Sequence, residues 1–270
     1  MTINMKDKVI LISGGTSGIG EGCVREFAKA GAKVFFCGRS TQKGEQIVQE
    51  LSSQGYDVGF VTADLSITEN NRFVVDKCAE KFGRIDGVIA NVGGSEGKNN
   101  WVHKIDDEDY KKLINLNYMS AFYLTKHSLP YMLKQESGGS FVYMTSATMV
   151  RPQPWQSHYG PAKQAMLQLA RQVSLEYGRY NINANCVAPG TTYTPILEKN
   201  GITPDAASRM NPAHKVVYPK DVAHCCAFLL DENARYVTGT NIFADYAFSC
   251  GTPWDALSGQ EYMQNVKPFD

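Results

Sequence analysis

The chain has 270 residues, of which 43% are hydrophobic and 20% charged, enough apolar material for one sizeable core. Lysine plus arginine and aspartate plus glutamate each number 27, so the formal net charge is zero and the composition supplies no basic surface for a phosphate backbone. The apolar run near the N-terminus, residues 9–12, is too short for a membrane span or a signal sequence. We therefore expect a cytoplasmic protein that binds neither nucleic acid nor membranes.

Apolar runs that are typical of buried strands alternate with amphipathic helical stretches along the chain. Strands are expected at residues 9–13, 34–37, 58–62, 87–90, 139–145, 181–187 and 240–244. Apolar residues recur at helical spacing within residues 20–30, 69–82, 110–133 and 159–177. This alternation predicts an α/β fold with a doubly wound parallel sheet of the Rossmann-like kind. No repeat or linker divides residues 1–270, so we expect a single domain.

Two stretches, residues 93–106 and 191–219, are long and irregular, and the second contains four prolines. In a doubly wound sheet, ligands bind beyond the carboxyl ends of the strands, where long functional loops belong. We expect both stretches to face the substrate, with residues 191–219 as the main substrate loop.

The cysteines and histidines give no sign of a metal site. The seven cysteines are odd in number and lack the C-x-x-C spacing of zinc or redox sites, so reduced thiols are expected. Cys225 and Cys226 lie in an apolar helical stretch and are interpreted as core residues rather than redox sensors. Four of the five histidines share no metal-ligand spacing with acidic residues: His103, His127, His214 and His224.

A glycine-rich turn follows the first expected strand directly and reads Ser13-Gly14-Gly15-Thr16-Ser17-Gly18-Ile19-Gly20. Glycines without a Cβ atom allow a tight turn and bring backbone N–H groups close to a pyrophosphate at the start of a helix. A plain turn can look the same, but the strand before it and the helix after it favour a dinucleotide site.

Tyr159 and Lys163 lie four residues apart, so both side chains project from one face of the expected helix. A free phenol has a pKa of about 10, and a neighbouring ammonium group favours the phenolate and brings it nearer to neutral pH. Pro161 falls in the first turn and Ser157 is the expected N-cap. His158 points about 100° away from Tyr159 around the helix, so we expect it on the surface or in a pocket wall.

The glycine spacing and the Tyr-x-x-x-Lys pair together resemble the short-chain dehydrogenase/reductase family, and the likeness runs from about residue 8 to residue 245. The resemblance implies an NAD(P)-dependent oxidoreductase with four catalytic residues in the family's chain order: Asn117, Ser146, Tyr159 and Lys163. In that family the tyrosine donates and accepts the proton and the serine holds the substrate oxygen. The asparagine holds a water that connects the lysine to solvent.

The resemblance also implies which residues bind the dinucleotide. Asp64 matches an adenine-contacting aspartate, Asn91 and Gly93 keep two residues of an Asn-Asn-Ala-Gly stretch, and Pro189-Gly190 matches a turn by the nicotinamide. From the residues alone, Asp64 is equally well explained as a strand-end cap. The full expected cofactor set is Gly14, Thr16, Ser17, Gly18, Ile19, Gly20, Arg39, Ser40, Asp64, Leu65, Asn91, Gly93, Tyr159, Lys163, Pro189, Gly190, Thr192 and Thr194.

The end of the second expected strand indicates which dinucleotide binds. An NAD enzyme places a carboxylate on the ribose 2′-hydroxyl at this point, whereas this chain has Gly38, Arg39 and Ser40. A guanidinium there can form charge-assisted bonds to a 2′-phosphate and stack on adenine, so we expect NADP. Ser17 stands where many NADP-dependent members of the family carry a second basic residue, which keeps NAD as the alternative.

The C-terminal part departs from the family. The usual Asp-Gly-Gly ending reads Asp245-Tyr246-Ala247, and a tail of residues 246–270 continues beyond it. The departure concerns local packing and subunit contacts rather than the chemistry. Members of the family usually assemble through the helices that carry the asparagine and the tyrosine, so we expect a homo-oligomer, either a tetramer or a dimer.

The expected pocket segments contribute a set of large apolar side chains: Met149, Trp155, Tyr193, Ile196, Leu197 and Met210. They indicate a hydrophobic carbonyl or alcohol substrate, such as a hydroxysteroid or bile acid, although ordinary packing would use the same residues. Two alternatives stay open. A 3-oxoacyl-carrier-protein reductase would need a basic patch at the entrance, and a non-catalytic dinucleotide-binding regulator would not need four intact catalytic positions.

Overall fold

Seven parallel strands form one sheet in the order β3-β2-β1-β4-β5-β6-β7 in the computed structural model, which describes residues 5–95 and 98–251. The strands are β1 (Val9–Ser13), β2 (Lys33–Gly38), β3 (Val58–Thr62), β4 (Gly87–Ala90), β5 (Gly139–Met144), β6 (Ile182–Pro189) and β7 (Asn241–Ala244). The chain winds outward from β1 to β3 and then in the opposite direction from β4 to β7. The expected doubly wound α/β fold is therefore confirmed, and its topological switch point lies between β1 and β4.

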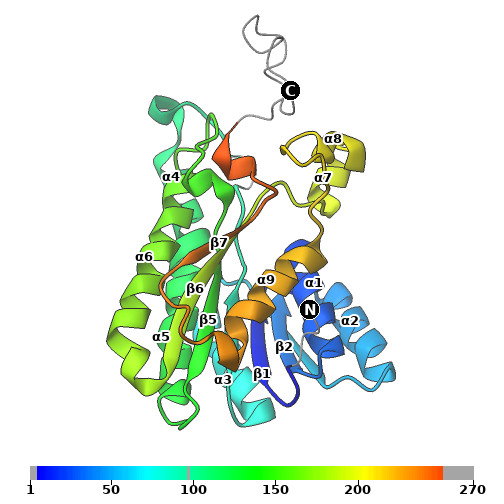
Figure 1. Cartoon of the computed structure of the whole chain (residues 1–270), viewed down its shortest axis with the longest axis vertical. Helices are drawn as coiled ribbons and strands as arrows, with labels where there is room; N and C mark the ends of the chain where they lie inside the picture. The colour runs from blue at the N-terminus through cyan, green and yellow to red at the C-terminus, as the bar shows by residue number, and fades with distance from the viewer. Residues whose placement is uncertain (1–4, 96–97, 252–270) are drawn as a thin grey trace, which may run out of the picture.

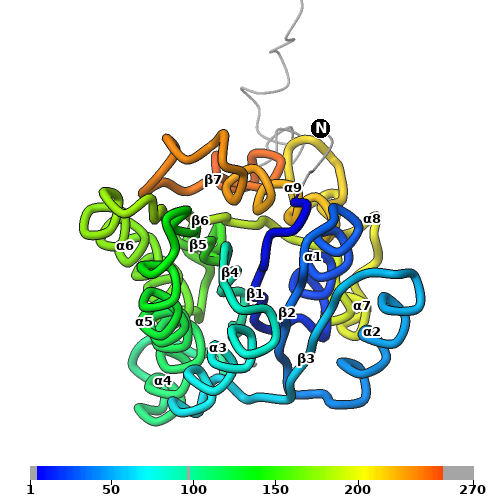
Figure 2. Tube along the Cα trace, turned by 90° about the horizontal axis from the view of Figure 1, so that it is seen from below, coloured from blue at the N-terminus to red at the C-terminus, as the bar shows by residue number. Residues whose placement is uncertain are grey.

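Helices cover both faces of the sheet (Figures 1 and 2). One face carries α1 (Gly18–Lys29), α2 (Thr41–Ser53) and α9 (Pro219–Leu230). The other carries α3 (Thr68–Phe82), α4 (Asp107–Ile114), α5 (Ser120–Met132) and α6 (Tyr159–Tyr177). No helix in the described part of the chain is long and apolar enough to cross a membrane.

The central strands are mostly apolar because both of their faces are covered. Every residue of β1 is buried. Successive side chains of a strand point to opposite faces, so Leu11 packs into the core on the side of α3, α5 and α6, whereas Ile10 and Ile12 pack on the side of α1, α2 and α9. The sheet is thus the shared middle layer of two hydrophobic cores, and it holds the carboxyl ends of its strands in fixed relative positions.

The helical stretch expected at residues 110–133 is interrupted, so that prediction was wrong in one respect. The segment Asn115–Met119 between α4 and α5 is a π-helical turn. Such a turn adds one residue to the helix, which hardly alters the apolar spacing along the sequence. One tertiary and one local bond stabilise it: the Asn115 side chain donates to the Ser66 carbonyl over 2.6 Å, and the Asn117 side chain donates to the Leu113 carbonyl, four residues earlier, over 2.9 Å.

The segments expected to be irregular contain short helices. Residues 191–219 include α7 (Pro195–Lys199) and α8 (Pro204–Ser208), and the described part of residues 93–106 includes a 3-10 turn at Val102–Lys104. Both stretches lie beyond the carboxyl ends of the strands, as expected (Figure 1). Of the C-terminal tail, residues 246–251 are described and form a 3-10 turn at Phe248–Cys250, while residues 252–270 lie outside the described residues.

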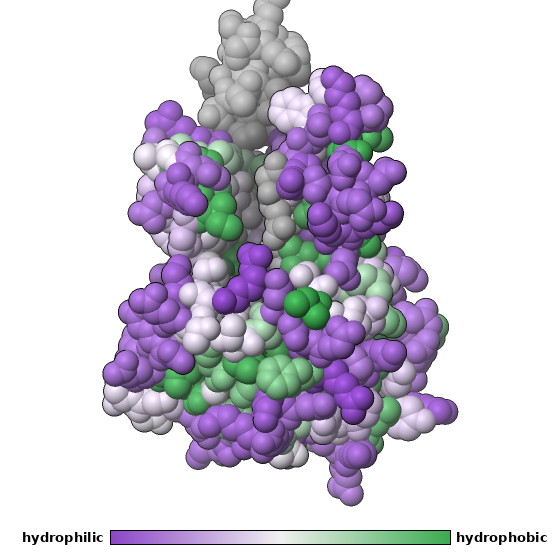
Figure 3. Space-filling model, turned by 180° about the vertical axis from the view of Figure 1, so that it is seen from behind, coloured by the Kyte–Doolittle hydropathy of each residue, from purple (hydrophilic) through white to green (hydrophobic). Residues whose placement is uncertain are grey.

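Two lobes rise above the sheet, one formed by α7 and α8 and the other beside α4 (Figure 1). The outer surfaces of both lobes are largely hydrophilic in the space-filling view (Figure 3). The carboxyl ends of the strands lie at the base of these lobes (Figure 1).

Candidate active site

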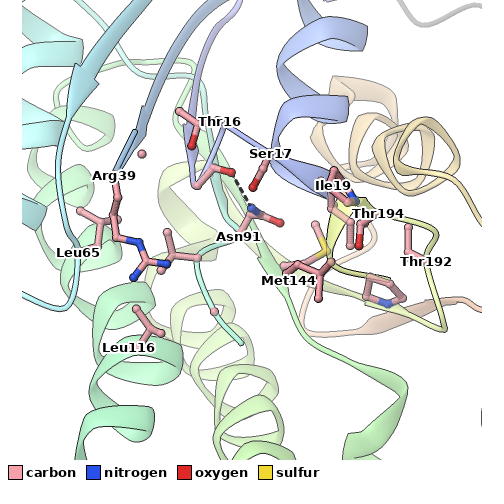
Figure 4. A pocket seen from close by; sticks show the side chains of 18 of the residues that line it. Thr16, Ser17, Ile19, Arg39, Leu65, Asn91, Leu116, Met144, Thr192 and Thr194 are labelled. Carbon is pink, nitrogen blue, oxygen red and sulfur yellow. Dashed lines mark hydrogen bonds between the residues drawn. The ribbon is translucent and has the colours of Figure 1, made fainter. Parts of the chain in front are cut away.

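A cavity of about 690 Å³ lies beyond the carboxyl ends of the six strands β1 to β6, around the topological switch point. Its volume is in the usual range for small-molecule and cofactor sites. Of the residues predicted to bind the cofactor, those that line it are Gly14, Thr16, Ser17, Gly18, Ile19, Arg39, Ser40, Asp64, Leu65, Asn91, Gly93, Tyr159, Lys163, Pro189, Gly190, Thr192 and Thr194. Arg39 and Leu65 lie at one end of the view in Figure 4, and Thr192 and Thr194 at the other.

The glycine-rich turn between β1 and α1 forms one wall. Gly14 and Gly18 have positive φ angles of 68° and 56°, which favour glycine. Gly20 does not line the cavity, but a Cβ atom at this position would lie 2.1 Å from the carbonyl oxygen of Gly14. Gly20 therefore shapes the turn by allowing the start of α1 to pack directly against the backbone after β1.

The turn is tied to β4 across the switch point. The Ser13 hydroxyl accepts hydrogen bonds from the backbone N–H groups of Asn91 and Val92 over 2.9 and 3.1 Å. The Asn91 side chain donates back to the Ser13 carbonyl over 3.0 Å and points toward the glycine-rich turn (Figure 4). These bonds hold the ends of two neighbouring strands together where a dinucleotide would cross them.

Two cationic side chains lie at the end of the cavity beside β2. Arg39 was predicted there, but Lys43 was not, and it also lines the cavity. Lys43 lies in the first turn of α2, where its N–H group donates to the Ser40 side chain at the N-cap over 3.4 Å. The sequence signal for Lys43 was its place three residues after an N-cap serine, but the helix at Thr41–Ser53 was not recognised.

Asp64 caps the end of a strand and also lines the cavity, the two roles that its sequence position suggested. Its Oδ1 atom accepts from the N–H and the hydroxyl of Ser66 over 3.0 and 2.8 Å, so the side chain caps the turn after β3. Asp64 and Leu65 also line the cavity next to Arg39.

Tyr159 and Lys163 lie on the same face of α6, with the Lys163 ammonium 5.5 Å from the centre of the Tyr159 ring. Lys163 is 2% exposed, and its Nζ donates to the Met144 carbonyl at the end of β5 over 2.9 Å. Burial lowers the pKa of Lys163 from 10.5 to about 8, because the low-dielectric surroundings disfavour the ammonium form.

Ser146 lies two residues after the end of β5 and acts on Tyr159. Burial raises the pKa of the Tyr159 phenol, and a hydrogen bond from the Ser146 hydroxyl acts in the opposite direction by stabilising the phenolate. The turn that carries Ser146 packs closely on the first turn of α6. A Cβ atom at Gly160 would lie 3.2 Å from the Thr148 carbonyl oxygen, so glycine at this position permits the close approach.

Asn117 is fully buried at the π-helical turn and does not line the cavity. Its side chain forms two hydrogen bonds with the backbone of Gly94, donating over 2.9 Å and accepting over 3.0 Å. A Cβ atom at Gly93 would lie 2.5 Å from the Asn117 amide oxygen and 2.7 Å from the Lys163 Nζ. The asparagine and the lysine thus meet at Gly93, and the four predicted catalytic residues converge in space.

The segment in which the resemblance placed the nicotinamide begins at the last residue of β6. Pro189, Gly190, Thr192 and Thr194 line the cavity there. A Cβ atom at Gly190 would lie 2.8 Å from the Cβ of Asp245, so a larger residue would displace the end of β7.

Two local predictions near Tyr159 were wrong. The N-cap position of α6 is His158 rather than Ser157, and no side chain caps this helix end. His158 is fully buried instead of exposed, and it packs obliquely on the Tyr110 ring at 6.5 Å. Burial lowers the pKa of His158, so the neutral imidazole is favoured. The packing of α4 against α6 decides this, and it cannot be read from helix geometry alone.

Of the six apolar residues predicted for the substrate pocket, only Ile196 lines the cavity. Trp155 is exposed and packs edge-on against Trp101 at 6.3 Å. The described residues contain no group of three or more His, Cys, Asp or Glu side chains that could hold a metal ion.

Comparison with known proteins assigns this geometry to a family. A family model described as enoyl-(acyl carrier protein) reductase matches residues 14–249, which include the glycine-rich turn and all four converging residues. The chain belongs to the short-chain dehydrogenase/reductase family. It is a nicotinamide-dependent oxidoreductase.

Named relatives within the short-chain dehydrogenases/reductases have diverse substrates. The chain is 31% identical over 252 residues to an L-rhamnose-1-dehydrogenase of Scheffersomyces stipitis, covering 91% of this chain and 97% of that one. It is 29% identical over 252 residues to a 7alpha-hydroxysteroid dehydrogenase of Bacteroides fragilis, covering 92% and 96%. A solved short-chain dehydrogenase/reductase from Mycobacterium ulcerans superimposes with a TM-score of 0.86 at 26% identity, covering 98% of this chain and 100% of that one.

Proposed function

We propose that this short-chain dehydrogenase/reductase uses NADP and transfers a hydride between the nicotinamide and the carbon of a secondary alcohol or ketone. The observation that carries the proposal is the arrangement along one cavity. Ser146, Tyr159 and Lys163 line it where β5 ends, and Arg39 and Lys43 line it beside the end of β2.

The residues present fit a dinucleotide. The glycine-rich turn presents backbone to the cavity, and the space that a Cβ atom at Gly20 would need is filled by backbone. Asp64 and Leu65 flank the adenine end, and Pro189 to Thr194 the nicotinamide end. When bound, the nicotinamide supplies or accepts the hydride.

In this proposal Tyr159 moves the proton. Because burial raises the pKa of its phenol, Tyr159 is protonated near neutral pH and donates to the carbonyl oxygen of a ketone. For alcohol oxidation the phenolate must form, and two groups favour it: the Ser146 hydroxyl by hydrogen bonding and the Lys163 ammonium by its charge. Ser146 also donates to the substrate oxygen and stabilises its developing charge.

Lys163 and Asn117 support this proton transfer. The bond from Lys163 to the Met144 carbonyl fixes the ammonium beneath the tyrosine. Asn117 holds the loop after β4 through Gly94 and lies next to the lysine at Gly93, where it would connect the lysine to solvent.

Two cations at the adenine end support NADP rather than NAD. A 2′-phosphate carries charge that a guanidinium and an ammonium stabilise, whereas a 2′-hydroxyl gains little from them. The position after β2 carries no carboxylate that would repel the phosphate. Lys43 supplies the second basic group that Ser17 does not.

Binding titrations test the cofactor assignment. Replacing Arg39 and Lys43 together with Gln should weaken NADPH binding by at least about tenfold, a loss of about 1.4 kcal/mol or more, and leave NADH binding within about twofold. Lys77→Gln, on an exposed face of α3, is the matched control and should bind both nucleotides as the parent does. Equal loss of both nucleotides, or tighter NADH than NADPH binding by the parent, would contradict the assignment.

For the substrate, we propose a hydrophobic ketone or alcohol such as a hydroxysteroid or bile acid. The hydroxysteroid dehydrogenase among the relatives and the exposed apolar residues on the segments around the cavity, Trp155, Ile196 and Met210, support this class. The alternative is a 3-oxoacyl-carrier-protein reductase, which a relative of that description from Thermotoga maritima, 31% identical over 245 residues, supports.

NADPH consumption across a panel of steroid ketones, 3-oxoacyl thioesters and sugar lactones separates these classes. We expect the largest kcat/KM for a steroid ketone. Tyr159→Phe should reduce the rate by about 100-fold or more. A preferred oxoacyl thioester would favour the alternative, and a Tyr159→Phe variant as active as the parent would overturn the proton-transfer role.

We also propose that the enzyme forms a homo-oligomer through α5 and α6. Leu133, just after α5, and Leu175, in α6, are 42% and 82% exposed. Such apolar surface is typical of subunit contacts. Light scattering should give at least twice the chain mass, and a monomer at micromolar concentration would contradict this.

We place the enzyme in the cytoplasm. All seven cysteines are free thiols in the structure, and five of them are buried: Cys23, Cys37, Cys78, Cys186 and Cys226. Free thiols persist in reducing compartments. Cell fractionation tests this assignment.

A further inference from the structure

Ser146 receives two hydrogen bonds from one residue, Thr148. The Thr148 hydroxyl donates to the Ser146 Oγ over 3.0 Å, and the Thr148 backbone N–H donates to the same oxygen over 3.2 Å. The backbone bond is an ordinary cap of the 3-10 turn Ala147–Met149, but the bond between the hydroxyls needs a side chain with a hydroxyl group at this position.

These two bonds decide what the Ser146 hydroxyl can still do. A hydroxyl has one proton to donate and two lone pairs that accept. Both lone pairs of Ser146 are used by Thr148, so its proton is directed to a third partner. The neighbouring group that can accept this proton is the Tyr159 phenol, whose pKa the Ser146 hydroxyl lowers.

The position of Thr148 is itself fixed by tertiary contacts. Its carbonyl oxygen packs against Gly160 in the first turn of α6, one residue after Tyr159, where even a methyl group would approach to 3.2 Å. The turn after β5 and the start of α6 therefore hold Thr148, Ser146 and Tyr159 in one connected arrangement.

We propose that Thr148 is a positioning residue that fixes Ser146 as a hydrogen-bond donor toward Tyr159 and the substrate oxygen. The proposal rests on the proposed hydride transfer for its catalytic meaning. A ketone oxygen and a phenolate both accept hydrogen bonds, so a serine that is held as a donor assists the reaction in both directions. Because a hydroxyl that accepts hydrogen bonds is a stronger donor, Thr148 also strengthens the bond that Ser146 gives.

The first arm of the test uses turnover of the holoenzyme. Thr148→Val keeps the shape and the backbone N–H but removes the hydroxyl, and Thr148→Ser keeps the hydroxyl. We expect the valine variant to lose about three- to tenfold in kcat with a nearly unchanged KM for NADPH, the size of one neutral hydrogen bond, and the serine variant to recover to within about twofold. The pH at which alcohol oxidation reaches half of its maximal rate should rise in the valine variant.

A matched control removes the same kind of bond elsewhere. The Thr238 hydroxyl is hydrogen-bonded to the Ser174 hydroxyl over 2.6 Å on an exposed part of the chain, away from the cavity. Thr238→Val should leave kcat and the pH profile as in the parent. A Thr148→Val variant that behaves like this control would overturn the proposal.

The second arm needs no substrate. In the complex with NADP⁺, the tyrosinate absorbance of Tyr159 is obtained as the difference between each protein and its Tyr159→Phe counterpart. Because Ser146 donates to the phenolate, Thr148→Val should raise the midpoint of this titration by about half a pH unit, and Thr148→Ser should restore it. An unchanged midpoint overturns the proposal.

The two arms separate this inference from the proposed function. If the parent reduces no carbonyl, the proposed reaction fails, and the titration of Tyr159 still decides the role of Thr148. Should Thr148→Val not fold, Thr148→Ala, which also lacks the hydroxyl but needs less space, replaces it in both arms with the same expected result.

Discussion

Lys163 must place a positive charge near Tyr159 and must also bury that charge. Its ammonium must lie near the Tyr159 phenol, and this position buries it almost completely, with the Met144 carbonyl as an acceptor. Burying a charged group with few compensating bonds is unfavourable, and the lowered pKa measures this cost. The site thus keeps a destabilising group because its chemistry requires it.

The burial of Lys163 predicts a specific dependence of stability on pH. Between pH 8 and 10.5 the unfolded lysine binds a proton that the folded lysine has lost, so this group makes the free energy of unfolding rise with pH in that window. Relative to Lys163→Met, the parent should gain up to about 3 kcal/mol across it. Urea denaturation without cofactor at several pH values measures the difference. Parallel curves for the two proteins would show that the buried pKa is not lowered.

Tyr246 and Ala247 show backbone strain at the point where this chain departs from the family ending. Both have positive φ angles, 48° and 63°, although neither is glycine. The Asp245 carboxylate holds this conformation by accepting from the backbone N–H groups of Ala247 and Ser249 over 3.0 and 2.8 Å. The left-handed backbone typical of glycine is therefore retained with larger residues.

Replacing Ala247 with glycine should relieve this strain. We expect Ala247→Gly to raise the free energy of unfolding by about 0.5–1 kcal/mol, because the left-handed conformation costs alanine about 1–2 kcal/mol and the greater entropy of glycine in the unfolded chain offsets part of this gain. Ala213→Gly in an exposed loop without positive φ is the matched control and should be neutral or destabilising. Chemical denaturation measures both. Destabilisation by Ala247→Gly to the same extent as the control would contradict the strain.

At the scale of the elements, the first β-turn-α unit depends on close backbone contact. The start of α1 packs on the turn after β1, and Gly20 fills the point of closest approach. α1 in turn packs against α9, where Gly22 lies against Pro219. A change at Gly20 must therefore move the helix, the turn or both.

We predict that Gly20→Ala abolishes tight cofactor binding and destabilises the fold by about 2 kcal/mol or more, because its Cβ would overlap the Gly14 carbonyl. Gly178→Ala is the matched control: Gly178 has an ordinary φ of −55° at the end of α6, and a Cβ there meets nothing within 4 Å. It should be neutral or slightly stabilising. Thermal unfolding with and without NADPH distinguishes them, and equal behaviour of the two variants would rule out the clash.

At the scale of the whole molecule, the cavity joins parts of the chain that are far apart in sequence. Its wall runs from Gly14 to Ile196 and includes the ends of six strands. A ligand in this cavity therefore contacts both halves of the doubly wound sheet. Because only the folded state offers such a site, binding stabilises the molecule as a unit.

Saturating NADPH should raise the free energy of unfolding by about 2.7 kcal/mol when the cofactor is at 100 times its dissociation constant. The shift should appear in a single cooperative thermal transition that moves as a whole. The Arg39 and Lys43 double substitution, at the same cofactor concentration, should remove about half or more of the shift for NADPH and leave that for NADH. A shift confined to one of two separate transitions would contradict coupling through the sheet.

Local patterns in the sequence were sufficient to predict most of the fold and part of the candidate site. The seven strands were found because both faces of the sheet are covered and each strand is almost entirely apolar. The glycine-rich turn and the Tyr159–Lys163 pair were found because their spacing follows from local backbone geometry, and together they indicated the family. Ser146 and Asn117 were then found because the chain resembles that family.

Contacts between distant segments decided the rest. The π-helical turn at Asn117 and the burial of His158 each depend on which elements pack together, and no local pattern encodes that. The same holds for the place of the Lys43 side chain in the cavity wall and for the lowered pKa of Lys163. The sequence by itself determined the fold and the class of chemistry, whereas burial and packing in three dimensions set the proton affinities and the donor directions that this chemistry uses.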